Sequence, residues 1–323
     1  MSIKKPCRRL ELNKPICGNS PSATRSRRRP LTRQFDYLRP DSIDAAIAMK
    51  SRHGDRARYW AGGTDLMLQW RQGEVTIDHC IDLTHLDGLD GIEALPGEIR
   101  IGAMATLDDL DRAASMHPVM KALGDTARLM CTKQTRTLAT VGGNMCNASP
   151  GADLSPLFVA LESRCLIQGP NGRRDVSMED FLTGVNTTDL EAEELLCAIV
   201  VPVPQARREA SYRRVARTVV DIALVSAAVS LTADAGTITH ARIALGSVAP
   251  VPVRVKEGEK ALAGRSLDDI DATHLEEAAG HAAAVAKPIS DVRAGASYRT
   301  RMCPVLVRRA LADALGRLGG NKR

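Results

Sequence analysis

The sequence predicts an α+β protein made of two small α/β lobes and a C-terminal α+β domain. Two features predict the lobes: short apolar or β-branched runs alternate with amphipathic ones, and two of the apolar runs lead directly into a Gly-Gly pair. A third feature predicts the last domain, because three longer strand-like runs follow one another beyond residue 208 and helical segments come after them. The 323 residues are enough for two or three domains.

The two lobes are expected at residues 34–90 and 91–208. In the first, a turn and helix cap at residues 39–42 precede a helix at 43–50, a strand ends at 59–60, and 77–83 alternate as a strand would. In the second, the predicted elements are strands at 99–103, 137–141, 164–168 and 200–202, helices starting at Thr106 and covering 119–130 and 154–161, and a hairpin turn at 170–172.

The C-terminal domain is expected at residues 209–323. Its predicted elements are antiparallel strands at 212–215, 223–231 and 238–245, a connector at 250–253, and covering helices at 255–263, 274–285 and 301–318.

The stretch TLATVGGNMCNASPGAD, from Thr137 to Asp153, carries the first functional signal. The pair Gly142-Gly143 before Asn144 predicts a turn in which the backbone can adopt φ > 0 and expose successive amides, and such amides form an anion site. A carboxylate just beyond it, Asp153, could accept the hydroxyls of a ribose. An ordinary hairpin turn with a helix-capping aspartate would explain the same residues.

A second Gly-Gly pair strengthens the nucleotide hypothesis. The run Tyr59, Trp60, Ala61, Gly62, Gly63, Thr64, Asp65 and Leu66 again joins a strand end to a turn and then to an amphipathic segment. Two such turns could hold one pyrophosphate. Neither is the G-x-G-x-x-G fingerprint or a G-x-x-x-x-G-K-[ST] loop, which argues against a parallel dinucleotide-binding sheet and against a phosphate loop.

Five segments together resemble one known family. They are AGGTDL (61–66), IGAMATLDDL (101–110), ATVGGNMCNASPGAD (139–153), VDIALVSAAV (220–229) and DVRAGASYRTRM (291–302). In this order they are similar to the FAD-binding medium subunit of the molybdenum hydroxylases, which include xanthine dehydrogenase, carbon monoxide dehydrogenase and 4-hydroxybenzoyl-CoA reductase. The resemblance spans about residues 34–315 and implies an FAD-binding fold of the vanillyl-alcohol oxidase (PCMH-like) type.

The resemblance also implies roles for individual residues. Both Gly-Gly loops would hold the FAD pyrophosphate, the second through Thr140, Val141, Gly142, Gly143 and Asn144, and Asp153 would bind the ribose. Arg213 would lie near the flavin pyrimidine, Ile222 over the isoalloxazine ring, and Thr106 would be a further contact. Simpler explanations exist for the last three: a solvated strand-face arginine, core packing, and a helix N-cap.

The implied function is electron transfer. The medium subunit passes electrons between [2Fe-2S] clusters of a small subunit and an external acceptor or donor, while a large subunit with the molybdenum cofactor turns over the substrate. The expected assembly is a dimer of heterotrimers, and no catalytic residue is expected in this chain. Alternatives are the β subunit of a 4-hydroxybenzoyl-CoA reductase-type aromatic reductase and a self-contained flavoprotein oxidase.

Composition limits the remaining possibilities. No apolar run approaches the roughly 18 residues of a membrane span, and no apolar N-terminal segment resembles a signal peptide, so a cytoplasmic protein without a membrane partner is expected. Residues 1–33 hold ten basic residues and one acidic residue, a balance of +9, so the other residues carry 6 − 9 = −3. We expect a disordered basic head that does not bind nucleic acid, because charge alone gives only nonspecific attraction.

The cysteines and histidines predict neither a metal site nor a covalent flavin. The eight cysteines form no C-x-x-C pair, and Cys131, Cys146 and Cys165 lie on segments badly placed to hold one cluster. Neither Gly-Gly loop contains a histidine, so we expect noncovalent FAD and no iron in this chain.

Overall fold

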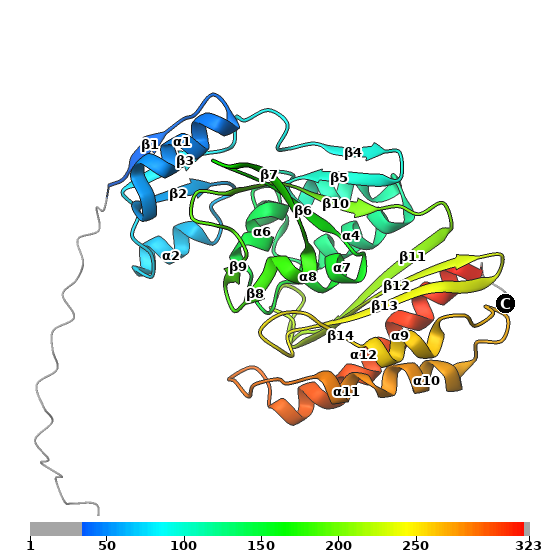
Figure 1. The fold of residues 1–323 in the computed structure, drawn as a ribbon. Helices are drawn as coiled ribbons and strands as arrows, with labels where there is room; N and C mark the ends of the chain where they lie inside the picture. The colour runs from blue at the N-terminus through cyan, green and yellow to red at the C-terminus, as the bar shows by residue number, and fades with distance from the viewer. Residues whose placement is uncertain (1–33, 320–323) are drawn as a thin grey trace, which may run out of the picture. The chain divides into compact units, whose positions relative to one another are not determined.

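The computed structural model describes residues 34–319, and its folded unit begins at Phe35 (Figure 1). The predicted basic head, residues 1–33, lies outside the described residues. Among residues 34–319, none of the helices combines the length and the apolar composition that a membrane span requires.

The first lobe is a small sheet with helices at its strand connections. It contains β1 (Asp36–Leu38), α1 (Ile43–His53), η1 (Gly54–Arg56), β2 (Ala57–Trp60), α2 (Leu66–Gln72) and β3 (His79–Asp82). The predicted cap at Ser42 is confirmed, because its side chain accepts a hydrogen bond from the Ala45 amide at 3.2 Å. The strand order is β1-β3-β2 and both pairs are parallel. The argument against a parallel sheet is therefore wrong for this lobe, since helical crossovers between short strands need no fingerprint.

The second lobe is built on an antiparallel sheet of order β4-β5-β10-β6-β7. Its strands are β4 (Ile92–Leu95), β5 (Glu98–Gly102), β6 (Arg164–Gly169), β7 (Gly172–Ser177) and β10 (Leu195–Pro202), with a small pair β8 (Leu182–Gly184) and β9 (Thr187–Thr188). Its helices are α3 (Leu107–Arg112), η2 (Ala113–Ser115), α4 (Pro118–Leu129), α5 (Lys133–Arg136), α6 (Val141–Asn147), α7 (Leu154–Ala160) and α8 (Met178–Phe181).

The predicted strand at residues 137–141 is wrong. Thr140 is instead the N-cap of α6, and its hydroxyl accepts a hydrogen bond from the Gly143 amide at 3.1 Å. A threonine two residues before a Gly-Gly pair satisfies the β-branched pattern of a strand equally well, but the side-chain cap favours the helix here.

The third domain confirms the predicted succession of strands and helices. Its sheet contains β11 (Arg207–Val215), β12 (Val225–Asp234), β13 (Thr237–Gly246) and β14 (Val253–Arg254), all paired antiparallel. Its helices are α9 (Lys256–Leu262), α10 (Ala272–Gly280), α11 (Ala282–Val285) and α12 (Ala296–Gly319). Helices α9, α10 and α12 cover one face of the sheet (Figure 1).

The other face of this sheet packs on the second lobe. Val229 of β12 belongs to the core beneath the C-terminal helices, whereas its neighbour Ala228 belongs to the core formed with α4 and α7. The buried Arg208 also connects the sheet to the second lobe. Its guanidinium donates to Glu162 at 3.1 Å and to the Ser230 hydroxyl at 2.8 Å. The sheet is therefore fixed on both faces, which fixes the residues that β11 directs toward the second lobe.

The first Gly-Gly loop contacts the second lobe through backbone atoms, and this contact generates a prediction. A Cβ at Gly62 would lie 1.8 Å from the Leu138 carbonyl oxygen, and backbone atoms cannot move aside cheaply. We expect Gly62→Ala to lower the melting temperature of the full chain in calorimetry. Gly316→Ala is the control, because a Cβ there meets nothing within 4 Å in helix α12 and alanine favours a helix by about 0.5–1 kcal/mol. Equal melting temperatures for Gly62→Ala and wild type would contradict this packing.

Candidate functional site

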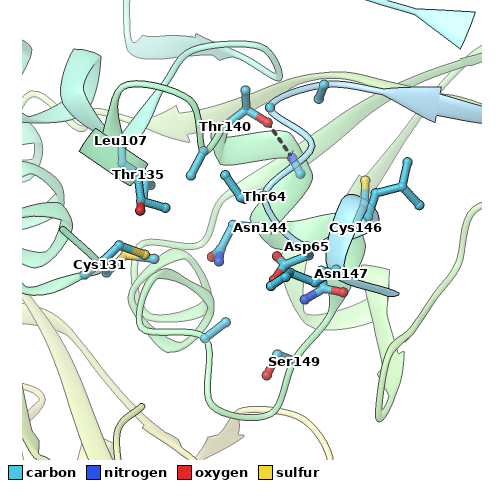
Figure 2. Close-up of a pocket in the computed structure, with 18 of the residues that line it drawn as sticks. Thr64, Asp65, Leu107, Cys131, Thr135, Thr140, Asn144, Cys146, Asn147 and Ser149 are labelled. Atoms are coloured by element: carbon cyan, nitrogen blue, oxygen red, sulfur yellow. Dashed lines mark hydrogen bonds between the residues drawn. The ribbon is translucent and has the colours of Figure 1, made fainter. Parts of the chain in front are cut away.

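A cavity of about 620 Å³ lies where the two Gly-Gly segments meet β11. Its volume is in the range of ordinary small-molecule sites. Figure 2 shows Cys131 and Thr135 on one side of the cavity and Asp65 and Asn147 on the other. The predicted site residues that line it are Tyr59, Ala61, Gly62, Gly63, Thr64, Asp65, Leu66, Thr140, Gly143, Asn144, Asp153 and Ile222.

The first Gly-Gly loop presents free amides to the cavity. Gly63 has φ = +67°, and a Cβ on it would meet the Trp60 ring at 2.4 Å, so the loop can adopt this path only with glycine. Within residues 34–319, the amides of Gly62, Gly63 and Thr64 have no hydrogen-bond partner. Consecutive free amides at the wall of a cavity form an anion-binding concavity.

The second Gly-Gly segment does not bare its amides, contrary to the prediction. The amides of Val141 and Gly142 donate to the carbonyls of Ala105 and Ala103, both at 2.8 Å, and the Gly143 amide donates to Thr140. The segment is the first turn of α6, which packs on the residues that follow β5. Its backbone amides therefore already donate hydrogen bonds within the protein. It offers the cavity space at Gly143 and the side chain of Asn144 instead.

Asn144 carries an unsatisfied polar atom. Its Oδ1 is buried and has no hydrogen-bond partner among the described residues. A buried polar atom without a partner costs about 1–3 kcal/mol, and Asn144 lines the cavity. A ligand donor that reached this oxygen would satisfy it.

Asp153 is buried between two side chains of β11. Its Oδ1 accepts from the Tyr212 hydroxyl, and its Oδ2 accepts from Arg214 Nη1 at 2.6 Å. Burial raises the pKa of the Asp153 carboxyl, while Arg214 and Tyr212 act to lower it. Burial and the nearby carboxylate raise the pKa of Tyr212 well above its usual value, so Tyr212 keeps the proton that it donates. Both carboxylate oxygens of Asp153, the residue predicted to bind the ribose, are therefore already hydrogen-bonded within the protein.

Arg213 does not face the cavity, and its predicted position near the flavin is wrong. Its guanidinium pairs with Asp313 of α12, at 2.8 Å for the Nη2 contact, and its side chain is half exposed. The next residue, Arg214, lines the cavity. Successive strand residues point to opposite faces, so only one of two adjacent arginines can face the site.

Four other predicted residues support the cavity from outside it. Trp60 packs beneath Gly63, Gly142 packs against Ala103, and Val141 is fully buried in the second-lobe core. Thr106 caps α3 in a capping box with Asp109, as its simpler explanation proposed. None of these four lines the cavity among the residues that the structure describes.

Ile222 lies at the rim of the cavity. It is 46% exposed, and a Cβ on Gly151 would meet its Cγ2 at 2.5 Å. Its neighbour Asp221 also lines the cavity and pairs with Arg217 at 2.6 Å. The segment is thus an apolar edge placed directly over the loop that precedes Asp153.

Sequence reasoning missed several lining residues. The Arg58 guanidinium has no ion-pair or hydrogen-bond partner among the described residues, and Arg58 lines the cavity beside the first loop. Gln69 of α2 donates to Asn147 of α6 at 3.2 Å and joins the two walls. Of these residues, only Arg58 could have been predicted from the sequence, because it is a basic residue beside a Gly-Gly turn.

No group of three or more histidine, cysteine, aspartate or glutamate residues within 34–319 could hold a metal ion.

A cavity with an amide-lined loop between two α/β lobes suits an anionic ligand such as a nucleotide, and two family models specify which kind. One, described as the FAD binding domain in molybdopterin dehydrogenase, matches residues 33–204. The other, the CO dehydrogenase flavoprotein C-terminal domain, matches residues 174–314.

Relatives agree over the same region. The carbon monoxide dehydrogenase medium chain of Afipia carboxidovorans is 36% identical over 88% of this chain and 97% of the relative. The xanthine dehydrogenase FAD-binding subunit of Escherichia coli O157:H7 is 28% identical over 88% and 97%. The solved carbon monoxide dehydrogenase from Hydrogenophaga pseudoflava matches with a TM-score of 0.83 at 33% identity, covering 88% of this chain and 98% of that one.

The chain therefore belongs to the family of FAD-binding medium subunits of the molybdenum hydroxylases. The predicted fold, two FAD-binding lobes of the PCMH type with a C-terminal domain, is confirmed.

The buried pair at Asp153 predicts a large effect on stability. Removing one partner leaves the other charge buried and unpaired, which typically costs about 3–5 kcal/mol. We expect Asp153→Ala to lower the free energy of unfolding by about that amount in urea titrations. Asp313→Ala is the control, because it removes the partner of Arg213, whose side chain is half exposed, and should therefore cost clearly less than Asp153→Ala. Similar losses in the two variants would contradict the difference in burial.

Proposed function

We propose that this cavity binds FAD noncovalently and that the chain relays electrons between [2Fe-2S] clusters and an external acceptor or donor. The observation that carries the proposal is the pairing of free donors with a free acceptor around one cavity: the amides of residues 62–64 and the buried, unpartnered Oδ1 of Asn144. A dinucleotide brings the complementary groups, anionic phosphates and polar ring or sugar donors.

The first loop would hold the pyrophosphate. Its amides supply donors, Thr64 adds a hydroxyl, and Arg58 is an unpaired cation within the described residues. Gly143 also lines the cavity, and a Cβ there would lie 2.8 Å from Thr140 Oγ1, so glycine keeps the cap of α6 intact. Asn144 would accept from the cofactor, and Asp153 would reach a ribose only through lone pairs that Tyr212 and Arg214 leave unused.

Bound FAD would supply exchange of electrons between one-electron and two-electron partners. The chain's own residues would bind and orient it and exclude water. Ile222 and Val220 would cover part of the ring from the rim. The relatives are named medium chains and FAD-binding subunits of dehydrogenases, which supports a relay rather than a self-contained oxidase.

Partner subunits complete the proposal. Relatives are named medium chains and FAD-binding subunits, which supports a large molybdopterin-binding subunit and a small [2Fe-2S] subunit as partners. We propose a dimer of such heterotrimers in the cytoplasm, with no nucleic-acid or membrane partner. Size measurement of the purified complex and cell fractionation test these two points.

Asn144→Leu tests the proposed site. Leucine has a similar size and removes the unsatisfied buried oxygen, so we expect the FAD-free protein to be as stable as wild type or more so, while FAD affinity falls by roughly tenfold or more. Apoprotein melting temperature and FAD titration measure the two effects. FAD released from the wild type by denaturation should separate fully from the polypeptide.

Gln69→Leu is the matched control, because Gln69 lines the same cavity but already donates to Asn147. Gln69→Leu should lose the hydrogen bond between α2 and α6, and its FAD-free form should not gain the stability expected of Asn144→Leu. Unchanged FAD affinity in Asn144→Leu would remove Asn144 from the site.

A further inference from the structure

We infer that Arg214 is a positioning residue that holds three walls of the cavity together and so sets the affinity for FAD. The inference rests on the proposed FAD binding and goes beyond it, because Arg214 acts on the walls through protein acceptors. One acceptor, Asp153, lines the cavity, and the other two, Leu129 and Val219, directly precede the lining residues Met130 and Val220.

The guanidinium of Arg214 reaches acceptors from three separate segments. Nη1 donates to Asp153 Oδ2 at 2.6 Å, and Nη2 donates to the Leu129 carbonyl at 2.5 Å and to the Val219 carbonyl at 2.6 Å. Leu129 is the last residue of α4, Asp153 precedes α7, and Val219 is in the loop 216–224 between β11 and β12. All three bonds join segments that are otherwise separate parts of the cavity wall.

The chemistry requires an arginine. The side chain of Arg214 is 7% exposed and that of Asp153 is 6% exposed, so the charges are compensated within the protein. A planar guanidinium presents donors in several fixed directions, and a cation also suits the carbonyl at the end of α4. A lysine has one head group and cannot hold carbonyls on two sides and a carboxylate with the same geometry.

The loop 216–224 is the wall most dependent on Arg214. Its tip is solvent-facing, with Val219 77% exposed and Ile222 46% exposed. Its far end is held by Arg299, which donates to the Leu224 carbonyl at 2.7 Å. The ion pair between Arg217 and Asp221 lies within the loop itself. The hydrogen bond from Arg214 to the Val219 carbonyl therefore connects the loop tip to the cavity. Releasing it would free Ile222 from its place over Gly151.

The test uses the full chain produced with its partner subunits. Arg214→Lys keeps the positive charge beside Asp153, and Arg214→Gln removes it. Arg213→Gln is the control, because it changes the adjacent arginine, whose guanidinium pairs with Asp313 away from the cavity. FAD dissociation constants, visible circular dichroism of the bound flavin and melting temperatures are measured for each.

We expect Arg214→Lys to melt close to wild type yet bind FAD roughly tenfold more weakly, with altered flavin dichroism, because the loop is released while the charge pair remains. Arg214→Gln should lose more affinity, and Arg213→Gln should match wild type. Flavin dichroism and affinity unchanged in Arg214→Lys, or losses in Arg213→Gln equal to those in Arg214→Lys, would overturn the inference. A wild-type complex without FAD would instead overturn the proposed function.

Discussion

The approach of two backbones at Gly62 is the constraint on which the cavity depends. The first lobe meets the second where this glycine lies against the Leu138 carbonyl, with no room for a side chain between them. The segment after Leu138 is itself fixed, because Thr140 bridges to Thr106 and the Gly142 amide bonds the Ala103 carbonyl. One lobe thus rests on a rigid part of the other, and the free amides of residues 62–64 are held at a fixed distance from Asn144.

The two Gly-Gly pairs are alike in sequence but have different structural roles. In the first pair, Gly62 permits close contact and Gly63 supplies the positive φ that this loop at the cavity wall requires. In the second pair, Gly142 permits helix α6 to pack on β5, while Gly143 lines the cavity and leaves the Thr140 hydroxyl free to cap the helix. One loop therefore provides donors and the other provides a boundary, and the third domain closes the site through β11 and the loop that follows it.

Much of the fold could be predicted from the sequence, because β12 and β13 carry long runs rich in apolar and β-branched residues and the C-terminal helices are amphipathic. Of β11 only residues 212–215 were predicted, because its first residues, Arg207, Arg208 and Glu209, carry no apolar strand pattern. Residues 137–141 could not be predicted, since a threonine before a Gly-Gly pair serves a strand or a helix cap equally well until its tertiary contacts are known. Arg213 and Arg214 are adjacent basic residues on one strand, and a shift of one residue reverses the face on which each lies. The partners of Asp153 are 59 and 61 residues away in the sequence, so no local pattern could reveal that its carboxylate was already engaged.

Hydrogen exchange of individual backbone amides, with and without FAD, tests the central claim most directly. The account places the pyrophosphate on the first loop, whose amides at residues 62–64 are free among the described residues, and assigns no cofactor bond to the amides of residues 141–143, which already donate within the protein. FAD should therefore slow exchange at residues 62–64 and leave that at residues 141–143 nearly unchanged. Protection confined to residues 141–143, or none at residues 62–64, would contradict the account.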